Sequence, residues 1–169
     1  MRLSEADVIA LTGASCTGKS EVAKQLQRRL GGELRCCGER VKGVARAKNI
    51  NPAALTIDDH QAIDDETRRW VEDRSGLLIV EGTFLDVVLR DYSVQLITLL
   101  ADDRERTRRM AKRQGRADDG DLIARDRSDA MLRAALYGSP GRAPDHAIDT
   151  SATSIEQVVA LVIATLRRS

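Results

Sequence analysis

The chain has 169 residues, and its 27 basic and 26 acidic side chains leave a formal net charge of +1. This length predicts one compact domain, residues 1–169, with a substantial core. The balanced charge indicates neither a nucleic-acid partner nor a membrane partner. Because the sequence shows no apolar run of membrane-spanning length and no apolar signal-peptide core, we expect a cytoplasmic protein.

The first predicted elements are a buried strand over residues 7–12 and an amphipathic helix that ends at Gly31, with a glycine-rich loop between them. The loop fits the pattern G-x-x-x-x-G-K-[ST] without a mismatch, and it reads Gly13, Ala14, Ser15, Cys16, Thr17, Gly18, Lys19, Ser20. In such a loop, backbone N–H groups and the dipole of the following helix bind phosphate oxygens. Lys19 would reach the β and γ phosphates, and the Ser20 hydroxyl would ligate Mg²⁺. The loop and its two flanks therefore predict a nucleotide site.

A short strand over residues 33–37 comes next, followed by a basic, partly amphipathic stretch over residues 39–48. Another helix is predicted over residues 58–74, with Asp58 or Asp59 as its N-cap. Its apolar residues are spaced to bury one face and leave an acidic face in solvent.

Residues 77–80 are consecutive apolar residues, and Glu81 and Gly82 follow them directly. This pattern puts Glu81 at the carboxyl end of a central strand, where open α/β sheets bind their ligands. A strand-end carboxylate in solvent is the alternative. We favour a functional carboxylate, because a charge next to a buried run normally needs a partner or a role.

A strand over residues 94–100 precedes a helix that Asp102 caps and that ends near Gly115. After a polar loop, a further helix is predicted over residues 121–137. Basic side chains crowd the first helix and the loop: Arg104, Arg106, Arg108, Arg109, Lys112, Arg113 and Arg116. Such a cluster suits a polyphosphate, although nearby carboxylates also allow a solvated helix face. In a phosphotransferase a mobile lid would lie here; elsewhere the two helices would form an ordinary hairpin.

The last predicted elements are a short strand over residues 145–151 and a helix for which Ser154 and Gln157 form a capping box. Strands and helices thus alternate along the whole chain. This order predicts an α/β fold with a parallel sheet that helices cover on both faces.

Taken together, these segments resemble the nucleoside monophosphate kinases, closest to the short cytidylate-kinase-like branch. The resemblance rests on the P-loop, Ile63-Asp64-Asp65, Val80-Glu81-Gly82, Arg125-Asp126 and Ile148-Asp149-Thr150-Ser151. It implies a P-loop kinase fold, a three-layer sandwich with a five-stranded parallel sheet. It further implies an acceptor-binding helical segment at about residues 38–75 and an arginine-rich lid at about residues 113–126.

The resemblance also implies an activity, ATP- and Mg²⁺-dependent phosphoryl transfer to a small-molecule acceptor. Lys19 would neutralise the transferring phosphoryl group, and Ser20 would hold the metal. The lid arginines that stabilise transition-state charge would be Arg109, Arg113 and Arg125. The candidates for acceptor binding are Arg40, Lys42, Asp58, Asp64 and Glu81.

Two departures from the branch bear on the acceptor. Thr83 stands where the branch has an arginine after Glu-Gly, and Lys42 stands where it has the acceptor arginine. Since a lysine cannot make the planar two-point contact with phosphate, weaker phosphate recognition follows. A nucleoside monophosphate comes first as acceptor. The alternative is a hydroxyl of a small metabolite or nucleoside, with Glu81, Asp64 or Asp58 as base.

A nucleotide-dependent switch or binding protein is a candidate from another class, because such proteins also use a P-loop. The chain has no segment like the guanine-specificity motif N-K-x-D and no second domain to be switched. These two features favour the enzyme.

Overall fold

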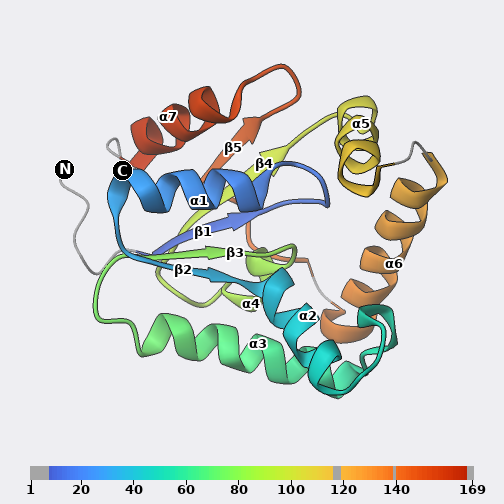
Figure 1. Cartoon of the computed structure of the whole chain (residues 1–169). Helices are drawn as coiled ribbons and strands as arrows, with labels where there is room; N and C mark the ends of the chain where they lie inside the picture. The colour runs from blue at the N-terminus through green and yellow to red at the C-terminus, as the bar shows by residue number, and fades with distance from the viewer. Residues whose placement is uncertain (1–7, 116–118, 139, 167–169) are drawn as a thin grey trace.

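A five-stranded parallel sheet lies at the centre of the structure, with strand order β2-β3-β1-β4-β5 (Figure 1). The computed structural model describes residues 8–115, 119–138 and 140–166. The strands are β1 (Val8–Thr12), β2 (Glu33–Cys36), β3 (Leu78–Glu81), β4 (Gln95–Leu100) and β5 (His146–Asp149). Every pairing between neighbouring strands is parallel, which confirms the predicted fold class.

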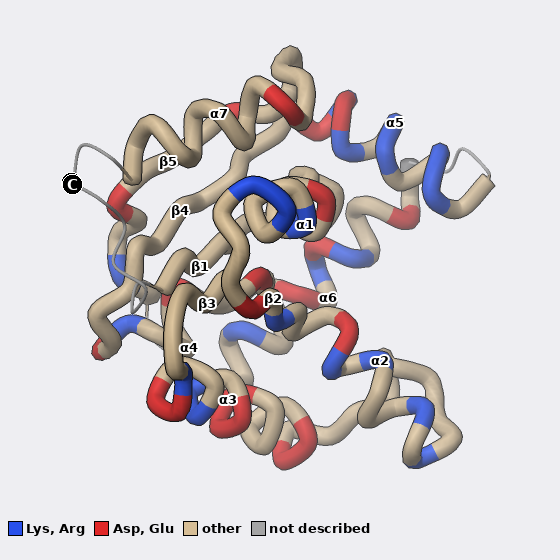
Figure 2. Tube along the Cα trace, turned by 60° about the vertical axis from the view of Figure 1, so that its left-hand side comes forward, with Lys and Arg blue, Asp and Glu red and all other residues tan. Residues whose placement is uncertain are grey.

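Helices cover both faces of this sheet, and Figure 1 shows α1 and α7 on one side and α3 and α4 on the other. The helices are α1 (Lys19–Leu30), α2 (Cys37–Ala47), α3 (Ile57–Glu72), α4 (Leu85–Val88), α5 (Asp103–Gln114), α6 (Asp119–Tyr137) and α7 (Ile155–Leu166), and a 3₁₀ turn spans Pro52–Ala54. Charged residues are spread over the helices, and basic ones recur along α5 (Figure 2). None of the helices within the described residues is long and apolar enough to cross a membrane.

The two faces of β1 explain its continuous apolar sequence. Successive side chains of a strand point to opposite faces of the sheet. Ile9 and Leu11 accordingly pack in the cluster beneath α1 and α7, whereas Val8 and Ala10 pack in the cluster beneath α3 and α4. All five residues of β1 are buried, and the four from Val8 to Leu11 are apolar, so this central strand shows no alternation of apolar and polar residues.

Helix α3 begins at Ile57 with Thr56 as its N-cap, so the prediction of Asp58 or Asp59 as the cap was wrong. The Thr56 hydroxyl accepts a hydrogen bond from the backbone N–H of Asp59, and the Asp59 carboxylate accepts one from the backbone N–H of Thr56. Asp59 is thus the second half of a reciprocal capping box. This pairing satisfies two backbone donors that would otherwise be exposed at the helix start.

Several element bounds also differ from the prediction. Strand β2 ends at Cys36, one residue before its predicted end, and α2 begins at Cys37, two residues before the predicted basic stretch. The helix α4 was not predicted, because four residues are too short to show helical periodicity. The predicted caps of α5 and α7 are confirmed. The predicted lid at about 113–126 includes residues 116–118, which lie outside the described residues.

Candidate active site

The loop between β1 and α1 has a backbone that requires glycine at two positions. Gly13 has a φ of 137°, and a Cβ there would lie 2.3 Å from the carbonyl oxygen of Leu99. Gly18, with a φ of 95°, is the N-cap of α1. Because glycine adopts such angles without steric cost, the chain can turn sharply at the end of β1. The turn brings the N-terminal end of α1 to face the loop, which is the arrangement that binds phosphate in P-loops.

Lys19, the first residue of α1, is nearly buried, with 8% of its surface exposed. Its Nζ donates hydrogen bonds to the carbonyl oxygens of Gly13 and Ala14, both at 2.8 Å. Burial lowers the pKa of Lys19, and the nearby Glu81 carboxylate opposes that shift. Backbone carbonyl oxygens of the loop therefore hold the Lys19 ammonium inside the loop. In this position the ammonium can bind a phosphate oxygen.

Ser20 and Glu81 bring two oxygen atoms together beside this lysine. The Ser20 hydroxyl donates to Glu81 Oε1 at 3.1 Å, and Glu81 is only 5% exposed at the end of β3. Hydroxyl and carboxylate oxygens are the ligands that Mg²⁺ prefers, and this ion usually keeps several waters. Two protein oxygens beside a phosphate-binding loop therefore fit a nucleotide-bound Mg²⁺. Within the described residues there is no cluster of three or more His, Cys, Asp and Glu that could hold a metal without a nucleotide.

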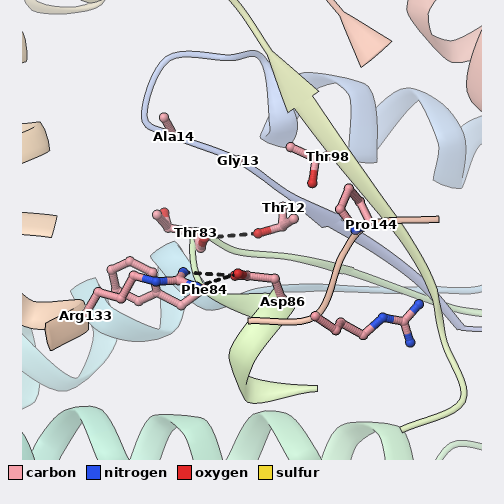
Figure 3. Close-up of a pocket in the computed structure, with 10 residues that line it drawn as sticks. Thr12, Gly13, Ala14, Thr83, Phe84, Asp86, Thr98, Arg133 and Pro144 are labelled. Atoms are coloured by element: carbon pink, nitrogen blue, oxygen red, sulfur yellow. Dashed lines mark hydrogen bonds and ion pairs between the residues drawn. The ribbon is translucent and has the colours of Figure 1, made fainter. Parts of the chain in front are cut away.

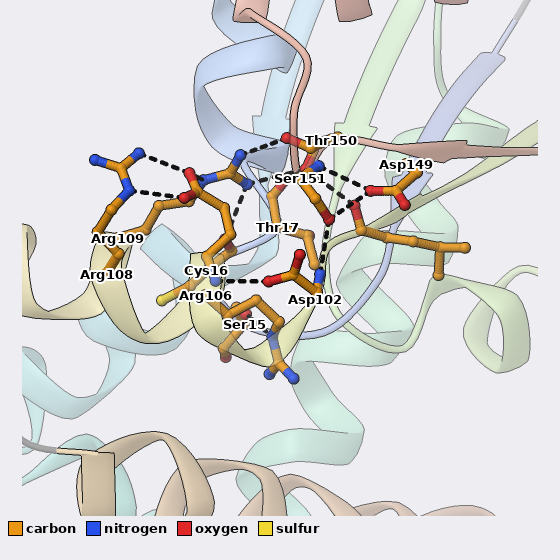
Figure 4. A network of polar contacts seen from close by, with 12 residues as sticks. Ser15, Cys16, Thr17, Asp102, Arg106, Arg108, Arg109, Asp149, Thr150 and Ser151 are labelled. Carbon is orange, nitrogen blue, oxygen red and sulfur yellow. Dashed lines mark hydrogen bonds and ion pairs between the residues drawn. The ribbon is translucent and has the colours of Figure 1, made fainter.

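Arg109 of α5 is hydrogen-bonded to the P-loop and to Thr150, as Figure 4 shows. Its guanidinium donates to the carbonyl oxygen of Thr150 at 2.6 Å, to the Thr150 hydroxyl at 2.9 Å and to the carbonyl oxygen of Cys16 at 3.3 Å. Its Nε also donates to Glu105 at 2.8 Å. The Thr150 hydroxyl in turn lies 2.9 Å from the carbonyl oxygen of Thr17. Thr150 thus joins the loop to Arg109, a role that the sequence analysis missed.

Arg106 is the second arginine of α5 that reaches the loop, and it was not among the predicted site residues. It is 6% exposed, and its Nε donates to the carbonyl oxygen of Ser15 at 2.9 Å. Asp126 of α6 accepts two hydrogen bonds from its other nitrogens, at 2.5 and 3.0 Å. This guanidinium therefore links the P-loop, α5 and α6. Arg106 lies four residues before Met110, the other buried residue of α5, so the two side chains share one face of the helix. This spacing is a weak sequence signal that Arg106 faces inward.

The remaining predicted lid arginines have different surroundings. Arg125 of α6 is about half exposed and forms an ion pair with Asp129 at 3.2 Å. The Asp129 carboxylate accepts a hydrogen bond from the Ser15 hydroxyl at 3.4 Å, and burial raises its pKa. Arg125 is thus connected to the loop through Asp129. Arg113 lies exposed in the last turn of α5.

Three of the predicted acceptor-binding residues lie on exposed surfaces of α2 and α3. Arg40 donates to Glu66 at 2.6 Å, and Lys42 donates to Glu39 at 2.7 Å. Asp58 is exposed in the first turn of α3. Both basic residues are therefore paired with carboxylates, Arg40 with Glu66 of α3 and Lys42 with Glu39 of α2.

Asp64, the fourth acceptor candidate, lies between α3 and α6. Its Oδ2 accepts a hydrogen bond from the Tyr137 hydroxyl at 2.7 Å. Burial raises the pKa of Asp64, and the bond from Tyr137 opposes that shift. Among the predicted site residues, the structure brings together Lys19, Ser20 and Glu81. Arg109 is hydrogen-bonded to the same P-loop.

Solved structures of other proteins, two of them named as kinases, share this fold. A gluconokinase from Sinorhizobium meliloti has a TM-score of 0.67 at 18% identity, covering 97% of this chain and 93% of that chain. For a shikimate kinase from Acinetobacter baumannii in complex with shikimate, the TM-score is 0.65 at 12% identity, with coverage of 96% and 93%. A tunicamycin resistance protein from Deinococcus radiodurans has a TM-score of 0.63 at 21% identity, with coverage of 95% of both chains. At such identities the likeness shows the fold alone, which is that of the P-loop kinases.

No curated protein matches the sequence significantly. A family model described as AAA domain matches residues 9–131. This stretch is more than half of the chain, and it contains the P-loop, Glu81 and the arginines of α5. The chain therefore belongs to the AAA domain family of P-loop proteins.

Proposed function

We propose that this protein catalyses ATP- and Mg²⁺-dependent phosphoryl transfer to a small-molecule acceptor. The observation that carries the proposal is the joint placement of Lys19, Ser20 and Glu81. A buried ammonium lies inside a phosphate-binding loop, directly beside a hydroxyl and a carboxylate that suit Mg²⁺.

In this proposal, several residues of the site each stabilise negative charge on the phosphates. Lys19 neutralises negative charge on the β and γ phosphates, and Ser20 with Glu81 holds the metal, whose bound form supplies further positive charge to those oxygens. Arg109, Arg113 and Arg125 stabilise charge that develops on the transferring group. In the transfer itself, an acceptor oxygen bonds to the γ phosphorus while the bond to the β–γ bridging oxygen breaks, and ADP is the second product.

The position of the basic residues favours a hydroxyl as acceptor. Arg40 and Lys42, the two cations that would hold an acceptor phosphate, are exposed and paired with Glu66 and Glu39. Thr83 supplies no charge where an arginine would be needed. The structural neighbours named gluconokinase and shikimate kinase also support a small metabolite as acceptor. A hydroxyl acceptor must lose a proton. Because Glu81 is assigned to the metal in this proposal, Asp64 and Asp58 are the remaining candidate bases, and the half-buried Asp64 is better enclosed than the exposed Asp58.

A nucleoside monophosphate remains the second candidate acceptor, in a cytidylate-like kinase. The order of Val80-Glu81-Gly82 and Arg125-Asp126 along the chain supports it. With a phosphate acceptor no base is needed, and catalysis reduces to positioning and charge neutralisation.

A nucleotide-dependent switch, the candidate from another class, can be distinguished from a kinase by its activity. It would hydrolyse ATP slowly, and no acceptor would stimulate the hydrolysis.

The test is a coupled assay for ADP release with ATP and Mg²⁺, run with nucleoside monophosphates, nucleosides and small hydroxylated metabolites. We expect acceptor-dependent turnover that Lys19→Met reduces by about a hundredfold or more. Arg28→Met, which changes an exposed cation on the outer side of α1, serves as the matched control and should retain the wild-type rate. Equal ADP release by the wild type and Lys19→Met, or release that no acceptor stimulates, would contradict the proposal.

A further inference from the structure

A pocket of about 280 Å³ adjoins the P-loop, and its walls come from five parts of the chain (Figure 3). Its lining includes Gly13 and Ala14 of the P-loop, three threonines, and the charged side chains of Asp86, Arg133 and Arg142. Gly13 and Ala14 are the first two residues of the loop that we propose for the phosphates of ATP. A group bound here therefore lies next to the proposed phosphoryl donor.

One wall of the pocket is an ion pair between α4 and α6. Arg133 donates to both carboxylate oxygens of Asp86, at 2.6 and 3.1 Å (Figure 3). The backbone of Gly141 passes directly over this pair, since a Cβ there would lie 2.0 Å from Asp86 Oδ2 and 3.0 Å from an Arg133 nitrogen. The backbone N–H of Arg142 donates to the Asp86 carbonyl oxygen at 2.9 Å. The backbone of Gly141 and Arg142 therefore packs against the pair, and the two hydrogen bonds between Arg133 and Asp86 orient their planar groups.

The charges around the pocket balance. Asp86 neutralises Arg133, and Asp145 accepts a hydrogen bond from Arg142 at 2.5 Å. An anionic ligand would gain little from a lining whose cations already have carboxylate partners, because an added anion would also face Asp86. This lining therefore suits an uncharged ligand.

The other lining groups are suited to hydroxyls. Thr12, Thr83 and Thr98 contribute hydroxyl groups, and the Thr12 hydroxyl donates to the Thr83 carbonyl oxygen at 3.0 Å. Phe84 adds an apolar ring, with the Arg133 guanidinium carbon 5.9 Å from its centroid. Asp86 can accept from one hydroxyl while Arg133, which has five N–H donors, donates to its neighbour. A volume near the lower end of the range for ligand pockets fits a compact molecule better than a nucleotide.

We propose that this pocket is the acceptor site and that it selects an uncharged polyhydroxylated molecule, a sugar or a polyol. Two adjacent hydroxyls of the ligand bind to Asp86 and Arg133, and a further hydroxyl faces Gly13 and Ala14, where it can receive the phosphoryl group. The transfer of a phosphoryl group to this ligand rests on the proposed function. The binding of the ligand in the pocket does not depend on it.

The experiment uses matched probes with the full chain: D-glucose, D-ribose, D-glucitol and myo-inositol as uncharged polyols, D-gluconate as a charged counterpart, and CMP and UMP as nucleotides. ADP release is measured with ATP and Mg²⁺, and the thermal unfolding midpoint is measured with each probe in the absence of ATP. We expect an uncharged polyol to give the highest kcat/KM and to raise the midpoint.

The variants are Asp86→Asn, which keeps the shape of the side chain, and Arg133→Met, with Arg28→Met as the control. For the best polyol, the first two should raise KM by about tenfold with little change in the KM for ATP, and both should remove the midpoint shift. The control should behave as the wild type. Retention of ATP binding shows that the variants are folded.

Each other result has one meaning. Highest kcat/KM with CMP, UMP or gluconate, or an unchanged polyol KM in Asp86→Asn, would overturn the pocket assignment. The absence of both turnover and a midpoint shift with every polyol would overturn it too. A polyol-dependent midpoint shift that Asp86→Asn removes, without ADP release by the wild type, would support the pocket and refute the proposed phosphoryl transfer.

Discussion

The Ser20 hydroxyl donates a hydrogen bond to Glu81 Oε1 across 3.1 Å, joining the first turn of α1 to the end of β3. The two residues are 61 positions apart in sequence, and parallel pairing of β1 with β3 brings them together. Leu11 lies opposite Glu81 in this register, so the P-loop and the carboxylate leave the sheet at the same edge. Because β3 fixes its position, Glu81 is oriented before any ligand binds.

Glu81→Gln should weaken the response to Mg²⁺ while leaving the fold intact. An amide oxygen is a poorer ligand than a carboxylate for a hard divalent cation, and the substitution also removes one negative charge. The Mg²⁺ concentration for half-maximal ADP release should rise by about 10- to 100-fold. A magnesium titration of the initial rate at fixed ATP measures this change.

Glu156→Gln provides the control for this titration, because Glu156 is an exposed carboxylate in the first turn of α7. It should leave the Mg²⁺ dependence unchanged. If Glu81→Gln and Glu156→Gln gave the same midpoint as the wild type, Glu81 would have no part in holding the metal.

Arg106→Lys should destabilise the protein, because a lysine cannot reproduce the planar contacts of this guanidinium. Arg106 satisfies the Ser15 carbonyl oxygen and both oxygens of Asp126 from a nearly buried position. Leaving such groups poorly paired should lower the free energy of unfolding by about 1–3 kcal/mol. Urea denaturation followed by circular dichroism gives this quantity. Arg104→Lys, an exposed change two residues earlier, should stay within about 0.5 kcal/mol of the wild type; an equal loss in both variants would rule out the linking role of Arg106.

The sequence was sufficient to predict the parallel α/β fold because its central strands are runs of apolar residues, with polar side chains only at their carboxyl ends, Thr12 and Glu81. β1 and β3 are buried on both faces, so their runs of apolar residues cannot be confused with a half-exposed strand. The start of α3 was harder to place. Thr56 and Asp59 have the spacing of a capping box, but the second residue of such a box is more often Glu or Gln.

The P-loop, Ser20 and Glu81 could be proposed from the sequence because each belongs to a local pattern, a phosphate-binding loop or the end of an apolar run. Thr150 and Arg106 could not, since their contacts with the loop span 133 and 91 residues. The four-residue spacing of Arg106 and Met110 is a weak local sign that Arg106 faces inward, and it does not stand out in a helix with this many basic residues. The pocket beside Asp86 and Arg133 was equally invisible, because it depends on the close approach of Gly141.

Cys36 and Cys37 should react slowly with thiol reagents in the folded protein. Burial raises the pKa of Cys36 to about 11 and that of Cys37 to about 12. Since the thiolate is the nucleophile, alkylation by iodoacetamide at pH 8 should be at least about a hundredfold slower than in the urea-unfolded chain. Cys16→Ser removes the third thiol, so the measured rate reports the adjacent pair alone. Rapid alkylation of this variant in the folded state would contradict the raised pKa of both thiols.

Asp64→Asn should change how stability depends on pH. Burial raises the folded-state pKa of Asp64 above the 3.8 of an exposed aspartate, so the folded state binds more protons than the unfolded state between those two values. Stability contributed by this group is complete below the unfolded pKa and declines as pH rises through the folded pKa. An asparagine has no proton to lose, and its amide oxygen can still accept the hydrogen bond from Tyr137. The free energy of unfolding of Asp64→Asn relative to the wild type should therefore increase from pH 3.5 to pH 7, as measured by urea denaturation, whereas Asp58→Asn at an exposed position should show no such trend. A pH-independent difference between Asp64→Asn and the wild type would mean that Asp64 is solvated and unsuited to receive a proton from an acceptor hydroxyl.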